Sequence, residues 1–161
     1  MGIKILPSHK SKKPFLLGSF GLFITEYGED REYLVSMINK YSIKSGKKWL
    51  NAGCGARFYP YPNVINCDLF PRHRCVMKVD LEKRLPFNNK EFSVAFTSHV
   101  FEHLIDPDRA FKELSRVADY VVCLVPYYTS YISNLSPEHR WKYRHHLITT
   151  ESCLYPRKKI R

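Results

Sequence analysis

The chain has 161 residues, 44% of them hydrophobic and 14% aromatic, which allows one well-buried core and excludes two full domains. We therefore expect a single domain over residues 1–161, with an N-terminal segment and helix (1–45) followed by the core (46–161). The net charge of +11, from 26 Lys and Arg against 15 Asp and Glu, favours an anionic partner such as nucleic acid, an acidic membrane surface or an anionic substrate.

Residues 15–24 form an apolar run after a basic stretch and superficially resemble a secretory leader. The run is too short to cross a bilayer, and the acidic, bulky residues 25–30 offer no small-residue cleavage site. We therefore predict no transmembrane segment and expect the run to pack over the domain as a lid.

The five cysteines are odd in number and have no Cys-x-x-Cys spacing. Most of them lie in or beside apolar runs, as buried thiols do. They therefore indicate reduced side chains in a cytoplasmic protein. They are Cys54, Cys67, Cys75, Cys123 and Cys153.

The first half of the chain predicts one helix and then three strands. Asp30 suits the N-cap of a helix that ends within residues 42–46. Strands are expected at 48–52, 64–68 and 75–80. The prolines of the segment 59–62 disfavour a helix between the first two strands, so that crossover helix should be vestigial or absent. The predicted buried stripe of the N-terminal helix is Tyr33, Leu34, Met37, Ile38 and Tyr41.

The second half continues the alternation with a strand at 93–98, a helix and a strand at 120–125. Asp106 and Pro107 start that helix as N-cap and first-turn residue. Strands that alternate with helices predict an α/β fold, Rossmann-like, with a mostly parallel sheet of about five strands and flanking helices. The expected buried stripe of this helix is Ala110, Phe111, Leu114 and Val117.

Two strand ends carry the strongest functional signal. The first strand stops in a Gly-x-Gly turn at residues 53–55, which allows the backbone to approach a bulky ligand closely. The next strand ends in Asp68, and a carboxylate there can accept both hydroxyls of a ribose. The pattern predicts a nucleoside pocket, with an ordinary tight turn as the alternative, because Arg57 occupies the usual position of a third glycine.

Five segments together resemble class I S-adenosylmethionine-dependent methyltransferases over roughly residues 47–150. Their order and spacing are more specific than any one of them. The resemblance is closest to a branch in which the first crossover helix is reduced to a loop. The segments are 49–55, Asp68, 79–87, 98–104 and 113–117.

The resemblance implies S-adenosylmethionine as the cofactor and gives roles to the strand ends. The glycine loop would pass under the methionine part, Asp68 would hold the ribose, residues 80–81 would meet the adenine edge, and residues 98–99 would border the methyl donor. The cofactor residues implied are Asn51, Ala52, Gly53, Cys54, Gly55, Asp68, Leu69, Asp80, Leu81, Ser98 and His99.

The candidate catalytic residues are His99, Tyr127 and His139. His139 occupies a place where similar enzymes have substrate-pocket residues, and it could act as an acid or base. It belongs to a stretch of cations and rings, 139–146, that could stack bases and neutralise phosphates. The same stretch could equally be an exposed loop that covers the edge of the core.

Residues 99–103 spell His-x-x-Glu-His, a pattern of some zinc peptidases in which both histidines lie on one helix. Here His99 directly follows a strand, so we expect no metal and interpret Glu102 and His103 as a structural pair. The segment 125–128 invites comparison with the Pro-Pro-Tyr signature of amino-group DNA methyltransferases. It follows the wrong strand and lacks the leading Asn or Asp, which argues against that activity.

These observations predict an S-adenosylmethionine-dependent methyltransferase whose acceptor is unidentified, with nucleic acid or another anionic molecule favoured by charge. The alternative is a non-catalytic nucleic-acid-binding protein with a degenerate methyltransferase fold, supported by the charge, Asn51 and Arg57. A third hypothesis is a lipid- or sugar-modifying methyltransferase that docks to a membrane through basic tails. We expect the sheet to lack the usual C-terminal hairpin, which leaves strand five as an exposed edge and predicts a homodimer through it.

Overall fold

A computed structural model describes residues 28–125, 137–143, 147–149 and 157–159. The expected lid at 15–24, Tyr127 and Cys153 lie outside these residues. The helices and strands are α1 (Gly28–Ser45), β1 (Trp49–Ala52), β2 (Val64–Asp68), β3 (Val76–Lys78), β4 (Phe92–Ser98), α2 (Pro107–Val117), β5 (Ala118–Leu124), β6 (Trp141–Tyr143), β7 (Leu147–Thr149) and β8 (Arg157–Lys159).

The main sheet has the strand order β3-β2-β1-β4-β5-β7. Strands β1 to β5 pair in parallel, as predicted. The strand order reverses beside β1, because β2 lies on one side of it and β4 on the other. In open α/β sheets such a switch point places a crevice at the carboxyl ends of the strands, where ligands bind.

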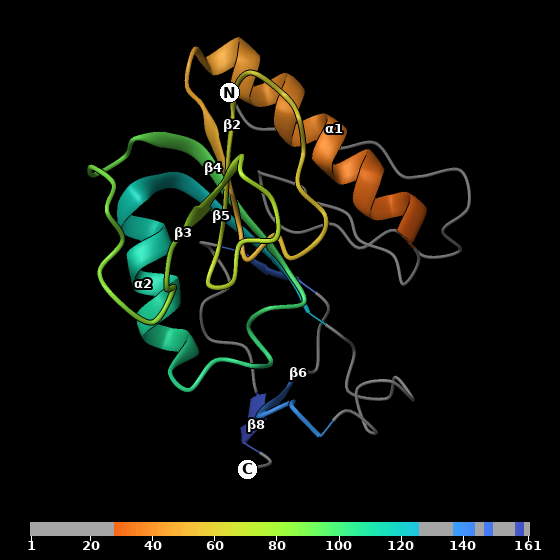
Figure 1. Cartoon of the computed structure of the whole chain (residues 1–161), viewed down its shortest axis with the longest axis vertical. Helices are drawn as coiled ribbons and strands as arrows, with labels where there is room; N and C mark the ends of the chain where they lie inside the picture. Colours follow the sequence, from red (N-terminus) through yellow and green to blue (C-terminus); the bar gives the residue numbers. More distant parts are fainter. Residues whose placement is uncertain (1–27, 126–136, 144–146, 150–156, 160–161) are drawn as a thin grey trace.

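The two helices cover opposite faces of the sheet (Figure 1), and the alternation of strand side chains explains why. Leu50 and Ala52 belong to the core cluster that contains the buried face of α2. Trp49, one position away, belongs to the cluster that contains the buried face of α1. The long apolar strands therefore bury both faces, as parallel strands do.

Helix α2 buries three of its four predicted stripe residues, whereas α1 fully buries two of five, Leu34 and Ile38. In α2, Asp106 caps the helix by accepting a hydrogen bond from the Arg109 backbone N–H at 3.1 Å, and Pro107 occupies the first turn, as predicted. In α1 the prediction for Tyr33 was wrong, because Tyr33 is 37% exposed and Val35 is fully buried instead. The buried face of α1 is thus rotated slightly from the stripe that the spacing predicts.

The connection from β1 to β2 contains turns and no helix, as the prolines predict. The Asn66 side chain holds this connection by two hydrogen bonds to the backbone of Tyr59. The Tyr59 N–H donates to Asn66 Oδ1 at 2.9 Å, and Asn66 Nδ2 donates to the Tyr59 carbonyl at 2.8 Å. An amide side chain therefore replaces the packing that a crossover helix would supply.

The free edge that we expected at β5 does not exist. Strand β7 pairs antiparallel with β5, with Cys123 opposite Ile148 and Leu124 opposite Leu147. The expectation was wrong because a short strand returns from the C-terminal region to this edge. The argument for a homodimer through that edge is thereby removed.

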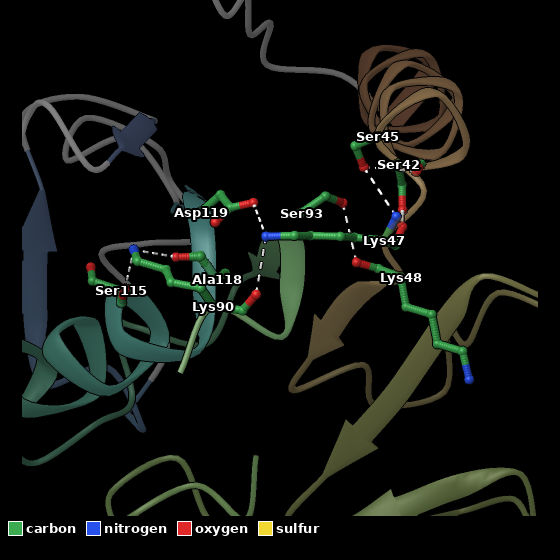
Figure 2. Close-up of polar contacts among 9 residues, drawn as sticks. All are labelled: Ser42, Ser45, Lys47, Lys48, Lys90, Ser93, Ser115, Ala118 and Asp119. Carbon is green, nitrogen blue, oxygen red and sulfur yellow. Dashed lines mark hydrogen bonds and ion pairs between the residues drawn. The ribbon is translucent and has the colours of Figure 1, made fainter. Parts of the chain in front are cut away.

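Lys47 and Lys90 lie at the amino ends of the strands, opposite the ends that carry Gly53 and Asp68 (Figure 2). Lys47 Nζ bonds Asp119 Oδ2 at 2.7 Å and the Lys90 carbonyl at 3.1 Å. Lys90 Nζ in turn donates to the carbonyls of Ser115 and Ala118, at 2.8 Å each, at the C-terminal end of α2. A cation suits the carbonyl end of a helix, so part of the positive charge is used within the fold.

In the part of the chain that the structure describes, none of the helices has the length and apolar character needed to span a membrane.

Candidate functional site

The switch point of the sheet lies where β1, β2 and β4 end. Ala52 of β1 pairs with Cys67 on one side and with Thr97 on the other. The residues that follow these positions, Gly53 and Asp68 among them, are therefore brought together although they are distant in sequence.

The glycine loop is bonded directly to the end of β2. The backbone N–H groups of Gly53 and Cys54 both donate to the Cys67 carbonyl, at 2.8 and 3.1 Å. The Gly55 N–H donates to Asp68 Oδ2 at 2.7 Å. The two strand ends singled out in the sequence thus form one unit.

Each oxygen of the Asp68 carboxylate accepts one hydrogen bond from the backbone. Its Oδ1 accepts from the Phe70 N–H at 2.9 Å, while Oδ2 accepts from Gly55. Each carboxylate oxygen has two lone pairs, so both can accept another donor. The side chain is therefore oriented by the backbone and retains acceptor capacity for hydroxyl groups.

The two glycines of the loop have different surroundings. Both have positive φ, +68° at Gly53 and +56° at Gly55. A Cβ at Gly53 would lie 2.4 Å from Val100 Cγ2, whereas a Cβ at Gly55 would meet nothing within 4 Å. The missing side chain at Gly53 thus makes room for Val100, whereas Gly55 faces open space.

Asn51 and Ala52 are buried within the sheet, with 1% and 0% exposure. Asn51 Nδ2 donates to Asn66 Oδ1 at 2.8 Å and to the Arg57 carbonyl at 3.3 Å. Its amide thus belongs to the network that shapes the β1–β2 connection. Leu69, after Asp68, is 42% exposed.

Asp80 and Leu81 lie after β3 and have opposite surroundings. Asp80 Oδ1 accepts from the Glu82 N–H at 3.0 Å, and Oδ2 lies 3.3 Å from Lys83 Nζ. The Glu82 hydrogen bond, with the Lys83 side chain, lowers the pKa of Asp80 below its usual value. Leu81 is buried against the core.

The Cys54 thiol in the glycine loop is buried, and that burial raises its pKa to about 11. The thiol is therefore neutral at physiological pH and is a poor nucleophile. The same cause raises the pKa of Cys67 and Cys123 to about 12. These three cysteines are buried thiols, as predicted, but Cys75 is exposed.

Two polar side chains mark the end of β4. Ser98 Oγ is buried and has no hydrogen-bond partner among the described residues. His99 has φ +56°, which is uncommon outside glycine, and its side chain is 63% exposed. The Leu124 carbonyl fixes its backbone by accepting from the His99 N–H at 2.8 Å.

The segment 99–106 after β4 consists of bends and turns. It contains no helix, so the zinc-peptidase arrangement of two histidines on one helical face does not form. The segment instead receives His139 from the C-terminal region, and the His139 ring packs edge-on against His103 with centroids 4.8 Å apart. The spacing of Glu102 and His103 is visible in the sequence, but their contact with His139 is a tertiary contact that no local pattern indicates.

Residues 50–119 match a family model described as a methyltransferase domain. This stretch is similar to methyltransferase domains. The resemblance to class I S-adenosylmethionine-dependent methyltransferases, predicted from the motifs, is confirmed, and the family implies S-adenosylmethionine as the cofactor. No curated protein matches the chain.

Several solved structures are similar to this chain. An S-adenosylmethionine-dependent methyltransferase from Mesorhizobium loti has 19% identity and a TM-score of 0.40, covering 51% of this chain and 47% of its own. The complex of the Haloferax volcanii Trm112 methyltransferase activator with a putative methyltransferase has 17% identity and a TM-score of 0.41. That match covers 62% of this chain and 55% of the other. A SAM-dependent methyltransferase from Aquifex aeolicus has 21% identity and a TM-score of 0.46, and the match covers 60% of this chain and 65% of the other. The chain thus spans less than two thirds of the length of each.

Proposed function

We propose that this protein transfers the methyl group of S-adenosylmethionine to an anionic acceptor at the carboxyl ends of β1, β2 and β4. The observation that carries the proposal is the bond between the two strand ends, Gly55 N–H to Asp68 Oδ2 at 2.7 Å. It presents an oriented carboxylate beside an accessible stretch of backbone at the switch point of the sheet.

Three features of the crevice fit the cofactor. Asp68 keeps lone pairs for the ribose hydroxyls, Gly55 has open space above its Cα atom, and Ser98 has a buried hydroxyl without a partner among the described residues. The bound cofactor supplies an electrophilic methyl group on a positively charged sulfur. We assign Asp80 and Leu81, after the neighbouring strand, to the adenine side.

The work of this chain in such a reaction is mainly positioning, because methyl transfer needs a nucleophile held in line with the methyl group. His99, exposed at the end of β4, is our candidate for accepting a proton from a hydroxyl or protonated amine. His139 and Tyr127 are further candidates. The net charge of +11 favours an anionic acceptor, nucleic acid included.

Binding calorimetry tests the proposal with a matched pair of variants. Asp68→Asn keeps the shape of the side chain but removes the charge that would bind the ribose, so the affinity for S-adenosylmethionine should fall about 10- to 100-fold. Asp119→Asn makes the same change at the opposite end of the sheet, beside Lys47, and should leave the affinity unchanged. Absence of cofactor binding by the natural protein would refute the proposal.

The second candidate function is nucleic-acid binding without catalysis. It is favoured by the positive charge and by Asn51, whose amide is committed to the chain's own contacts. Fluorescence anisotropy with labelled RNA and DNA distinguishes the two functions. Binding that weakens steeply with salt, in a protein without affinity for S-adenosylmethionine, would favour this candidate.

We also propose a cytoplasmic location, supported by Cys54, Cys67 and Cys123, which are free thiols in the described part of the chain.

A further inference from the structure

Glu102 is a fully buried carboxylate after β4. Its exposure is 0%, and no hydrogen bond from any described residue reaches Oε1 or Oε2. A buried carboxylate without partners costs several kcal/mol unless a cation compensates it. The fold therefore needs positive charge at this position.

Imidazole rings surround that carboxylate. His103 Nε2 lies 3.8 Å from Glu102 Oε1, and His99 Nδ1 lies 3.4 Å from the same oxygen. His139, 6% exposed, completes a group in which one ligand atom each from Glu102, His103 and His139 lies within 4.8 Å of the others.

The backbone fixes this arrangement from both sides. The N–H groups of Arg140 and Trp141 donate to the Glu102 carbonyl at 2.7 and 3.3 Å, and Trp141 Nε1 donates to the Leu104 carbonyl at 2.8 Å. These bonds hold the segment that carries His139 against the turn that carries Glu102 and His103. The three side chains therefore meet through main-chain contacts that are independent of any ligand.

The contact made by Nδ1 of His103 bears on whether its other nitrogen, Nε2, can bind a metal ion. His103 Nδ1 is 3.4 Å from the Glu138 carbonyl oxygen, which can only accept a hydrogen bond, so this contact suits a proton on Nδ1. In that neutral tautomer Nε2, 3.8 Å from Glu102 Oε1, is the nitrogen with a lone pair for a metal ion. Metal-bound histidines characteristically donate their other N–H to a backbone carbonyl in this way.

We propose that Glu102, His103 and His139 bind one divalent transition-metal ion of the zinc class. Metal–ligand bonds of about 2.0–2.2 Å place tetrahedral ligand atoms about 3.4 Å apart, so the observed separations need only small side-chain movements. Two imidazoles and one carboxylate suit zinc, cobalt, iron or manganese better than magnesium. This site is distinct from the Asp68 crevice and does not depend on the proposed methyl transfer.

The proposed ligand set has three members, which leaves one position of a tetrahedral ion open. Three protein ligands with an open position are typical of sites at which a metal acts on a bound molecule, whereas closed sets of four serve structure. Because the cluster follows β4, the ion lies at the ligand-binding end of the sheet. It can therefore bind an oxygen or nitrogen atom of a second molecule there.

Metal titration of the full chain, purified without a polyhistidine tag and stripped with a chelator, tests the proposal in the absence of S-adenosylmethionine. We expect one equivalent of Co²⁺ to give the visible absorption of a bound ion, Zn²⁺ to displace it, and Mg²⁺ to have no effect. Zn²⁺ should also raise the melting temperature. An absence of stoichiometric Co²⁺ and Zn²⁺ binding would overturn the proposal.

Two ligand variants and one control locate the ion. Glu102→Gln and His103→Ala should each weaken Zn²⁺ binding by more than about 10-fold, the scale found even for residues that only support a ligand. His73→Ala removes an exposed histidine that stacks on Phe58 and should leave binding unchanged. Retention of full affinity in both ligand variants would overturn the assignment.

Glu102→Gln also keeps the test valid if His103→Ala fails to fold. A neutral amide is cheaper to bury than an unpartnered carboxylate. The metal-free Glu102→Gln variant should therefore melt no lower than the metal-free natural protein, but without the upward shift that Zn²⁺ gives. A Zn²⁺-induced shift as large as that of the natural protein would contradict the proposal.

Discussion

Gly53 and Gly55 share a backbone conformation but serve different purposes. Both have positive φ, yet only Gly53 has a side chain, Val100, pressed against its Cα atom. The sequence motif alone suggests that both glycines make room for a ligand. The structure shows that one of them makes room for the turn after β4.

Alanine substitutions distinguish the two glycines. Gly55→Ala should cost about 1 kcal/mol of unfolding free energy, because only the left-handed conformation is penalised. Gly53→Ala should cost about 1–3 kcal/mol more, since the new Cβ overlaps Val100. Urea unfolding measures both changes.

The control is a double-mutant cycle with Val100→Ala. Gly53→Ala should be less costly in that background, whereas the cost of Gly55→Ala should not change. Equal costs for the two glycines in the natural background would contradict the crowding of Gly53.

The position of Asn51 was predictable from the sequence, but its hydrogen-bond partner was not. Its position at the end of β1 is legible from the sequence, and so is its departure from the usual acid. Its bond to Asn66 at 2.8 Å is not, because that bond depends on the exact strand register, which places Asn51 opposite Asn66. The glycine–Asp68 pair was predictable because ends of neighbouring parallel strands must meet.

Helix α2 organises the loop between β3 and β4 through one ion pair. Glu113 and Arg116 are bonded at 2.8 Å, and Arg116 also donates to the carbonyls of Leu85 and Phe87 at 3.0 and 2.9 Å. Glu113 in turn accepts from the Leu85 N–H at 3.0 Å. This pair, quoted from the sequence as part of a family motif, holds the loop onto the helix.

The pair predicts a pH-dependent stability. The hydrogen bond from Arg116, with that from Leu85, lowers the pKa of Glu113 in the folded state. Its contribution is therefore complete above the unfolded value of about 4.3 and is lost as the pH falls through the lower, folded value. Glu113→Gln should cost about 1–3 kcal/mol at pH 7, and the difference from the natural protein should shrink in strong acid.

Urea unfolding at several pH values measures this difference. Glu91→Gln is the control, because Glu91 is exposed and accepts from the Asn88 N–H in a surface turn. Glu91→Gln should lower the free energy of unfolding at pH 7 by less than Glu113→Gln does. A Glu113→Gln difference that stays constant from pH 7 into strong acid would show that the charge of Glu113 contributes nothing.

The strands within the β/α alternation were predictable, and the short strands of the C-terminal region were not. Strands β1, β4 and β5 are largely buried on both faces, so their sequences are mostly apolar. Strand β7, Leu147–Thr149, has only three residues among basic and polar neighbours, and nothing local distinguishes it from a loop. Its pairing with β5 is a tertiary contact, which explains why the edge was misjudged.

Across the whole molecule, the lysines that stabilise the fold and the candidate binding residues lie at opposite ends of the sheet. Lys47 and Lys90 serve the fold at one end, bonded to Asp119 and to the end of α2. The opposite end carries Asp68, the glycine loop and the Glu102 cluster. The switch in strand order explains this division, since it opens the sheet at its carboxyl ends.

A crystal structure of the protein with S-adenosylhomocysteine would show whether the ends of β1 and β2 bind the cofactor. We expect the ligand across these strand ends, with ribose hydroxyls within hydrogen-bond distance of the Asp68 carboxylate and the sulfur toward the end of β4. A ligand bound elsewhere, or an Asp68 that keeps only its contacts to Gly55 and Phe70 while ligand is present, would contradict this expectation.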